Sequence, residues 1–186
     1  DFQFMPPTFG ADNQSFAQQI TLSQGFQFVS SRFIPENPDM MDVLENVLNE
    51  NLAYVRNSVG NMLRKIGPNW VNGIGDWITT EGYLFKMNSE DGFSISGEVI
   101  DPQTPIDLIT GFQFVSYLPE NPMNALDAFT DILDNLIYVR NSTGQMLRQI
   151  GPTWINGIGD LIPNEGYLVK MNVEDVLIYP ETSDNL

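Results

Sequence analysis

The chain has 186 residues, and its 24 acidic side chains outnumber 8 basic ones, which gives a formal net charge of −16. A surface this negative repels phosphate backbones and anionic lipid headgroups, so nucleic acid and membrane surfaces are not expected as partners. The sequence contains no His and no Cys, which excludes thiol nucleophiles, Ser-His-Asp triads, imidazole or thiolate metal sites and disulfides. No apolar run is long enough to insert into a bilayer as a helix.

The strongest signal in the sequence is an internal repeat. Residues 52–88 recur without a gap as residues 136–172, and most positions are identical. Residues 25–38 recur as residues 111–122, with two residues fewer. This pattern predicts a tandem duplication of one supersecondary unit.

The repeat divides the chain into four segments. We predict an N-terminal extension (1–19), repeat 1 (20–105), repeat 2 (106–180) and a tail (181–186). The connector between the repeats is too short for a flexible linker. We therefore expect the two repeats to pack as one compact body.

In chain order, each repeat begins with a strand, in which Phe26 and Phe28 alternate with other residues. Asn37 and Pro38 then have the pattern of an N-cap followed by proline in the first helical turn. Over residues 40–48, apolar side chains recur every three or four positions, which predicts an amphipathic helix.

The rest of each repeat is predicted to be strands. Residues 53–58 and 61–66 are typical of a hairpin with Gly60 in its turn, and the Gly67-Pro68 pair is expected to end it. Further strands are predicted at residues 82–88 and 93–100. The order β-α-β-β-β-β, present twice, predicts a β-rich α+β fold with mostly antiparallel pairing.

Three motifs recur in both repeats. In repeat 1 they are G-F-Q-F-V-S, which starts at residue 25, W-x-N-G-I-G-D, which starts at residue 70, and E-G-Y-L-[FV]-K-M, which starts at residue 81. Together they resemble a tandem module of secreted Bacteroidetes proteins, often found near the C-terminal sorting signal of type IX secretion. That family has a leading tryptophan in its first strand, where this chain has Phe26 and Phe112. The resemblance implies an extracellular accessory module within a larger multidomain chain, and it implies no shared catalytic residues.

Three pairs of acidic residues recur, and each pair has a structural explanation. They are Glu36/Glu120, Asp76/Asp160 and Glu81/Glu165. A short acid after N-G-I-G commonly caps a turn, and an acid near the first turn of a helix interacts favourably with the helix dipole. We therefore expect neither carboxylate-pair catalysis nor any other enzymatic activity.

Aromatic side chains are the better candidates for a binding site, because exposed rings can pack against the apolar faces of sugars. The candidate ligand-binding residues are Trp77, Trp70, Trp154, Tyr83 and Tyr167. Trp77 is the most specific of these, because Leu161 takes its place in repeat 2 and the packing of the repeat therefore does not require tryptophan. For the recurring aromatics, Tyr54 and Tyr138 included, burial in the core is the alternative.

Six of the eight basic residues also recur in register. They are Arg56/Arg140, Arg64/Arg148 and Lys86/Lys170. One interpretation is that they pair with local carboxylates or cover apolar surface with their stems. The other is a small basic pocket for an acidic sugar.

Acidic residues cluster at the connector, where oxygen ligands could hold Ca²⁺. The three residues are Glu98, Asp101 and Asp107. The sequence has no D-x-D-x-D-G loop, so no cofactor is predicted, and Ca²⁺ at the connector stays an alternative.

These observations predict a non-catalytic, secreted or cell-surface accessory module that binds polysaccharide. The alternative is a structural or protein-interaction spacer at the cell surface, with another surface protein rather than a glycan as its partner.

Overall fold

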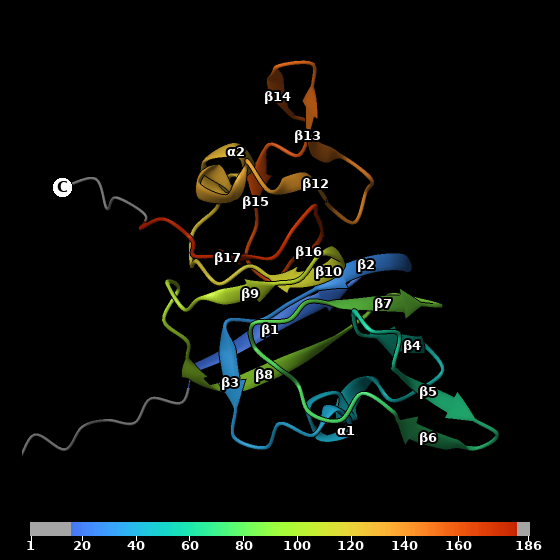
Figure 1. Cartoon of the computed structure of the whole chain (residues 1–186). Helices are drawn as coiled ribbons and strands as arrows, with labels where there is room; N and C mark the ends of the chain where they lie inside the picture. The colour runs from blue at the N-terminus through green and yellow to red at the C-terminus, as the bar shows by residue number, and fades with distance from the viewer. Residues whose placement is uncertain (1–15, 182–186) are drawn as a thin grey trace, which may run out of the picture.

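The computed structural model describes residues 16–181, which form mainly β-strands (Figure 1). Residues 1–15 of the predicted extension and 182–186 of the predicted tail lie outside the described residues. Among the described residues, no helix is long and apolar enough to cross a membrane.

The first half of the chain forms a five-stranded antiparallel sheet in the order β2-β7-β4-β5-β6. Its strands are β2 (Gly25–Val29), β4 (Leu52–Arg56), β5 (Met62–Ile66), β6 (Asn69–Asn72) and β7 (Tyr83–Met87). The predicted hairpin is confirmed as β4–β5. Gly60 in its turn has a φ of 93°, a left-handed value that glycine adopts without strain.

The second half forms an equivalent sheet in the order β10-β16-β12-β13-β14. Its strands are β10 (Gly111–Ser116), β12 (Leu136–Arg140), β13 (Met146–Ile150), β14 (Thr153–Asn156) and β16 (Gly166–Met171). The registers correspond too, and the same irregularity occurs where β4 meets β7 and where β12 meets β16. Side chains at equivalent sequence positions therefore occupy equivalent places in the two sheets.

Each half adds a smaller sheet. In the first half, β1 (Phe16–Leu22) and β3 (Phe33–Pro35) flank β8 (Asp91–Val99), and in the second half β9 (Ile106–Leu108) pairs with β17 (Asp175–Leu177). Because β1 begins at Phe16 and pairs with β8 along its whole length, the predicted boundary between residues 19 and 20 falls inside a strand. Residues 16–19 thus belong to the folded body.

The predicted amphipathic helix is shorter than its apolar spacing suggests. It consists of α1 (Met40–Val43) and the 3₁₀ turn η1 (Glu45–Val47), and the second half has α2 (Ala125–Ala128) and η2 (Thr130–Ile132). The N-cap is Asp39 rather than Asn37, since the Asp39 Oδ1 accepts a hydrogen bond from the Met41 N–H at 2.8 Å. Two valines and two asparagines among residues 43–49 are weak helix formers, which explains the early end.

Strands β6 and β14 differ from the sequence prediction, in which the Gly67-Pro68 pair ends the hairpin. In the structure this pair is a two-residue turn, since Ile66 pairs directly with Asn69. Gly67 has a φ of 61°. A positive φ at the first turn position is what a type II′ hairpin turn requires, and proline suits the second. The short pair β11 (Met123–Asn124) and β15 (Asp160–Leu161) was not predicted either.

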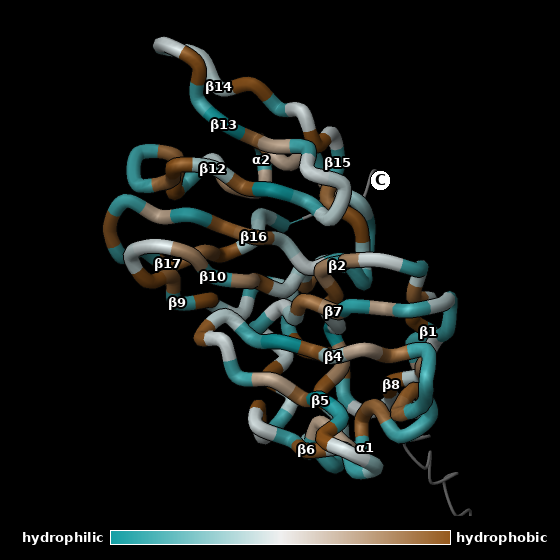
Figure 2. Tube along the Cα trace, turned by 90° about the vertical axis from the view of Figure 1, so that its right-hand side faces the viewer, coloured by the Kyte–Doolittle hydropathy of each residue, from teal (hydrophilic) through white to brown (hydrophobic). Residues whose placement is uncertain are grey.

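The two large sheets meet at the ends of β2 and β10. Backbone hydrogen bonds cross this junction from the Gly82 N–H to the Phe114 carbonyl at 3.1 Å and from the Ser30 N–H to the Asn164 carbonyl at 3.0 Å. Figure 2 shows the consequence: from β14 to β6, the strands of both sheets succeed one another on the same side of the molecule.

Two serine side chains close the junction reciprocally. The Phe28 N–H donates to Oγ of Ser142, and the Phe114 N–H donates to Oγ of Ser58, each at 2.8 Å. The two serines hold the same position in the turns of the β4–β5 and β12–β13 hairpins. Each half therefore satisfies an edge N–H group of the other, which would otherwise lack a backbone partner.

The buried apolar side chains form two separate clusters, one in each half. Each cluster lies between the inner face of a large sheet and the small sheet and helical turns that cover it. The halves are thus joined by strand edges and by the contacts at the junction, while each retains its own core.

Candidate functional site

The strands of the two large sheets succeed one another along one side of the molecule (Figure 2), and we call the outward side of these ten strands the outer face. In the first half its central row crosses all five strands, with the cross-strand neighbours Phe26, Lys86, Tyr54, Arg64 and Val71. Neighbouring strands are about 4.8 Å apart, so this row is about 19 Å long.

The second half repeats this row in the same register. Its neighbours are Phe112, Lys170, Tyr138, Arg148 and Ile155. Each row therefore alternates aromatic rings with cations and ends on an aliphatic side chain. A hollow of about 370 Å³ lies at that end of the first row, bordered by Met62, Arg64 and Val71.

Each central row begins with an exposed phenylalanine whose ring contacts the ammonium group of a lysine. Phe26 is 57% exposed and Phe112 is 52% exposed. Nζ of Lys86 lies 4.3 Å from the centre of the Phe26 ring, and Nζ of Lys170 lies 4.7 Å from that of Phe112. These cation–π contacts fix each ammonium group on the outer face.

A second pair of rows lies nearer the junction. The first half contributes Phe28, Leu84, Arg56 and Met62, and the second half contributes Phe114, Leu168, Arg140 and Met146. The rings of Phe28 and Phe114 touch, with 5.2 Å between their centres. The rows of the two halves are therefore joined without a gap.

Charge is strongly segregated in this molecule. The ten strands of the two large sheets contain no Asp or Glu, although the chain has 24 such residues, and they contain seven of its 8 basic residues. Six of these seven lie on the outer face, namely Arg56, Arg64, Lys86, Arg140, Arg148 and Lys170. An acidic protein thus carries one face whose strands hold only positive charges.

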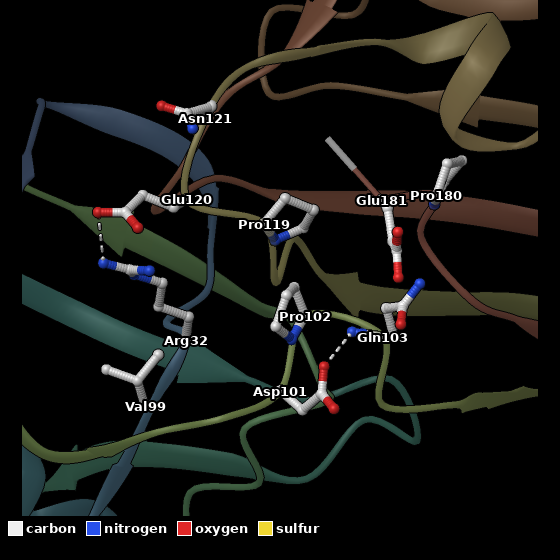
Figure 3. Close-up of a pocket in the computed structure, with 10 residues that line it drawn as sticks. All are labelled: Arg32, Val99, Asp101, Pro102, Gln103, Pro119, Glu120, Asn121, Pro180 and Glu181. Carbon is white, nitrogen blue, oxygen red and sulfur yellow. Dashed lines mark hydrogen bonds and ion pairs between the residues drawn. The ribbon is translucent and has the colours of Figure 1, made fainter. Parts of the chain in front are cut away.

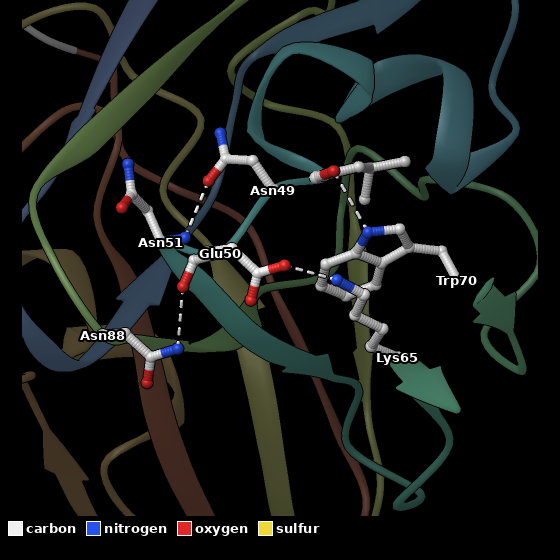
Figure 4. Close-up of polar contacts among 7 residues, drawn as sticks. Asn49, Glu50, Asn51, Lys65, Trp70 and Asn88 are labelled. Carbon is white, nitrogen blue, oxygen red and sulfur yellow. Dashed lines mark hydrogen bonds and ion pairs between the residues drawn. The ribbon is translucent and has the colours of Figure 1, made fainter. Parts of the chain in front are cut away.

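These six cations form no salt bridge within residues 16–181. The two ion pairs found there join Arg32 to Glu120 at 3.2 Å and Lys65 to Glu50 at 2.5 Å. Lys65 follows Arg64 in β5 and lies on the opposite side of the sheet, where Figure 4 shows its ammonium group at Glu50. Among the described residues, the recurring cations therefore do not pair with local carboxylates. The contacts of Lys86 with Phe26 and of Lys170 with Phe112 agree with the other half of that interpretation, in which the cations cover apolar surface.

The two arginines nearest the junction are held close to the sheet. An added Cβ on Gly60 would lie 3.8 Å from Nη2 of Arg56, and one on Gly144 would lie 3.6 Å from Nη2 of Arg140. Both guanidinium groups thus rest against hairpin turns. The Nε atoms of both arginines are buried and lack a hydrogen-bond partner in the described part of the chain.

Three of the five predicted aromatic site residues lie in the core instead. Trp77 is 2% exposed, and its ring centre lies 4.7 Å from that of Tyr83 and 6.2 Å from that of Phe93. Tyr83 and Tyr167 are fully buried. The prediction of these three side chains as a sugar platform is wrong, because no ligand reaches a ring inside the core.

The exchange of Trp77 for Leu161 between the repeats has a packing explanation. Leu161 is also fully buried, and the core of its half contains Tyr117 and Tyr179, whose ring centres lie 5.2 Å apart. Each half thus fills its core with a different set of large side chains. A difference between repeats at one position therefore did not indicate exposure.

The buried tyrosine hydroxyls have structural partners. The Tyr83 hydroxyl accepts a hydrogen bond from the Ile78 N–H at 2.7 Å, and that of Tyr167 accepts one from the Ile162 N–H at 2.8 Å. Burial raises the pKa of both tyrosines above the ordinary range. These hydroxyls are neutral, and their hydrogen bonds fix the loop that precedes β7 and the equivalent loop that precedes β16.

Trp70 and Trp154 are half-buried and pack against the cores of their halves. Nε1 of Trp70 donates a hydrogen bond to the Leu48 carbonyl at 3.1 Å, as Figure 4 shows. Trp70 pairs with Lys65, on the side of the sheet opposite the outer face. Both tryptophans anchor a hairpin to the core, and neither belongs to the outer face.

The three acids at the connector are not brought together. Within residues 16–181, no group of three or more acidic side chains could hold a metal ion. Asp101 instead accepts a hydrogen bond from the Gln103 N–H at 2.9 Å. The alternative of a calcium site formed by Glu98, Asp101 and Asp107 is therefore wrong.

A cleft of about 480 Å³ lies between the halves, where β8 leads into β9, away from the outer face (Figure 3). Acidic residues on its walls are Asp101, Glu120 and Glu181. Arg32 reaches across the cleft to Glu120, and this ion pair ties the first half to the second.

The third recurring pair of acids lies beside the junction. Burial raises the pKa of Glu81. Its counterpart Glu165 accepts a hydrogen bond from the hydroxyl of Tyr167 at 3.1 Å. Glu81 and Val115 form an isolated β-bridge, as do Val29 and Glu165. Both acids therefore belong to segments that join the halves.

Comparison of the chain with protein-family models, with curated proteins and with solved structures finds no match. The functional proposal therefore rests on the composition and geometry of the outer face.

Proposed function

We propose that this protein is a non-catalytic accessory module that binds polysaccharide on its outer face. The observation that carries the proposal is the alternation of aromatic rings with cations that have no ion-pair partner among residues 16–181, which occurs in both halves on strands without acidic residues.

The chemistry of the outer face suits a sugar chain. Pyranose rings have apolar C–H faces, which pack against aromatic rings such as Phe26 and Tyr54, and polar groups around their rims, which accept hydrogen bonds from Lys and Arg. The side chains stand on paired strands rather than on free loops, so little conformational entropy is lost when a ligand binds. A row about 19 Å long is an extended platform rather than a pocket for one small molecule.

The setting of the module is part of the same proposal. The equivalent strand orders and registers support a tandem duplication of one α+β unit, and the recurring motifs support membership of the Bacteroidetes module that the sequence resembles. That membership would place the protein outside the cell or at its surface, within a larger multidomain chain.

Affinity gel electrophoresis on a panel of polysaccharides tests the proposal. Replacing both exposed phenylalanines (Phe26→Ala with Phe112→Ala) should weaken retardation on the bound glycan at least about fivefold, because each row loses its most exposed ring. The matched control is Ile78→Ala with Ile162→Ala, two recurring side chains of similar exposure in loops outside the ten strands. Absence of retardation on every glycan, or equal weakening by both variants, would overturn the proposal.

A second candidate is a rigid spacer that binds no glycan. The reciprocal serine contacts and the hydrogen-bonded junction favour it, because they fix the two halves relative to each other. A spacer predicts that the outer-face variants change neither glycan retardation nor stability.

A further inference from the structure

We infer that the ligand is an acidic polysaccharide, whose carboxylate or sulfate groups pair with the six cations of the outer face while its sugar rings lie on the aromatic side chains. This inference rests on the proposed function and adds the chemical class of the glycan. It also assigns the two halves to one continuous site.

The outer-face cations differ from the other basic residues in having no ion-pair partner among residues 16–181. Cations on a protein with a large acidic excess normally have many carboxylates within reach, yet the six outer-face cations have no ion-pair partner among residues 16–181. Arg32 and Lys65, which lie elsewhere, both have one. As far as residues 16–181 are concerned, the six cations are thus available to an anion from a ligand.

The spacing of these cations matches a polymer of sugar rings with acidic groups. In each central row the tyrosine has a cation on both sides, with Lys86 and Arg64 flanking Tyr54 in the first half. A polymer that carries one acidic group on a sugar ring can place the ring on the tyrosine and the acidic group on a neighbouring cation. Arginine binds carboxylate and sulfate oxygens through two parallel hydrogen bonds, which adds orientation to the charge attraction.

The second rows of the two halves meet at the junction. Phe28 and Phe114 are in contact. In the second rows, Leu84 of β7 separates Phe28 from Arg56, and Leu168 of β16 separates Phe114 from Arg140. Cations therefore continue from one half to the other across the junction. A chain long enough to reach both halves gains the second set of contacts intramolecularly, which raises its affinity above that of a short oligosaccharide.

Single-stranded nucleic acid is the other polyanion that combines charge with stacking. The remainder of this protein disfavours binding of nucleic acid, because all 24 acidic residues lie outside the strands of the two large sheets, together with only one basic residue, Arg32. A less densely charged glycan that contacts only the outer face avoids most of this repulsion.

Affinity gel electrophoresis and titration calorimetry with defined polymers test the inference. The arms are polygalacturonate for carboxylates, a sulfated galactan for sulfate esters, a neutral glucan, and poly(dT). We expect the wild type to bind at least one acidic glycan at least about tenfold more tightly than the neutral glucan, with an affinity that falls as salt is raised. The acidic glycan that binds identifies the charged group.

A pair of variants with the same net charge isolates the outer face. Arg64→Gln with Arg148→Gln removes two cations from the central rows and should weaken binding of the acidic glycan at least about tenfold. Lys65→Gln with Arg32→Gln removes two cations elsewhere, and binding should stay within about twofold. Circular dichroism and thermal unfolding confirm that both variants are folded.

The outcomes separate the two proposals. Equal binding of neutral and acidic glycans without salt dependence overturns the acidic ligand while glycan binding stands. If the two charge-matched variants lose the same amount of affinity for the acidic glycan, the outer face is not the surface that recognises its charge. Binding of poly(dT) in preference to every glycan, or binding of none of the polymers, overturns both the inference and the proposed function.

Discussion

The rings of Phe28 and Phe114 lie 5.2 Å apart, centre to centre, although the two residues belong to different halves of the chain. They hold the same place in β2 and β10, so the contact brings two equivalent positions together. Both side chains lie on the outward side of their sheets, where they are only 9% and 8% exposed, and their contact closes the boundary between the two sheets.

The two equivalent serine contacts at the junction beside these rings predict that loss of either one lowers the stability of the protein by a similar amount. Ser58→Ala and Ser142→Ala each leave an edge N–H group without its acceptor, and each should lower the free energy of unfolding by about 1 kcal/mol. Urea denaturation measures both. Val59→Ala, in the same turn but 75% exposed, is the control and should change little. Loss of stability from only one of the serine variants would contradict a reciprocal junction.

Gly82 is predicted to tolerate no side chain. An added Cβ would lie 2.7 Å from the carbonyl oxygen of Val115, and this neighbour is backbone that cannot turn aside. Gly82→Ala should therefore cost about 1–3 kcal/mol of unfolding free energy. Gly166→Ala, whose Cβ would lie 3.1 Å from the Val29 oxygen, should cost less. Denaturation midpoints that rank the two variants in the reverse order would show that the halves approach differently.

Trp77 is predicted to act on stability alone. Trp77→Ala leaves a large cavity beside Tyr83 and Phe93 and should cost about 3–5 kcal/mol. Trp77→Leu, which imitates Leu161 of the other half, should cost less. If either folded variant lost glycan binding while keeping its unfolding free energy, Trp77 would be a ligand contact after all.

Glu81 makes stability depend on pH. Burial raises the pKa of Glu81 in the folded protein, so the stabilisation linked to its protonated form is complete below the ordinary glutamate pKa of 4.5 and is lost as the pH rises through the folded pKa. Glu81→Gln removes the buried charge and should raise the melting temperature at neutral pH. The difference from the wild type should disappear below pH 4.5. A variant that melts lower than the wild type at neutral pH would contradict this.

Much of the fold could be predicted from local pattern. The internal repeat, the β4–β5 hairpin, the strand β7 and the recurrence of the six cations all follow from residues close together in the sequence. The helix was overestimated because apolar spacing alone does not distinguish an α-helix from one helical turn followed by a 3₁₀ turn, which bury similar positions.

The candidate site could be predicted only in part, because it depends on non-local register. Phe26, Lys86 and Tyr54 are far apart in the sequence and become neighbours only when β2, β7 and β4 pair. Alternation shows that a strand has two sides but does not show which side the core covers when both carry aromatic residues. The lack of acidic residues in the ten strands was visible in the sequence, and it would have pointed to the outer face had the strand boundaries been known.

The most direct test of the outer face is a map of amide chemical shifts during titration with an oligosaccharide of the acidic glycan that binds. Shifts should concentrate on β2, β4, β5 and β7 around Lys86 and Tyr54, and on the equivalent strands around Lys170 and Tyr138. Shifts confined to the cleft around Arg32 and Glu120, with the ten strands unchanged, would contradict the account.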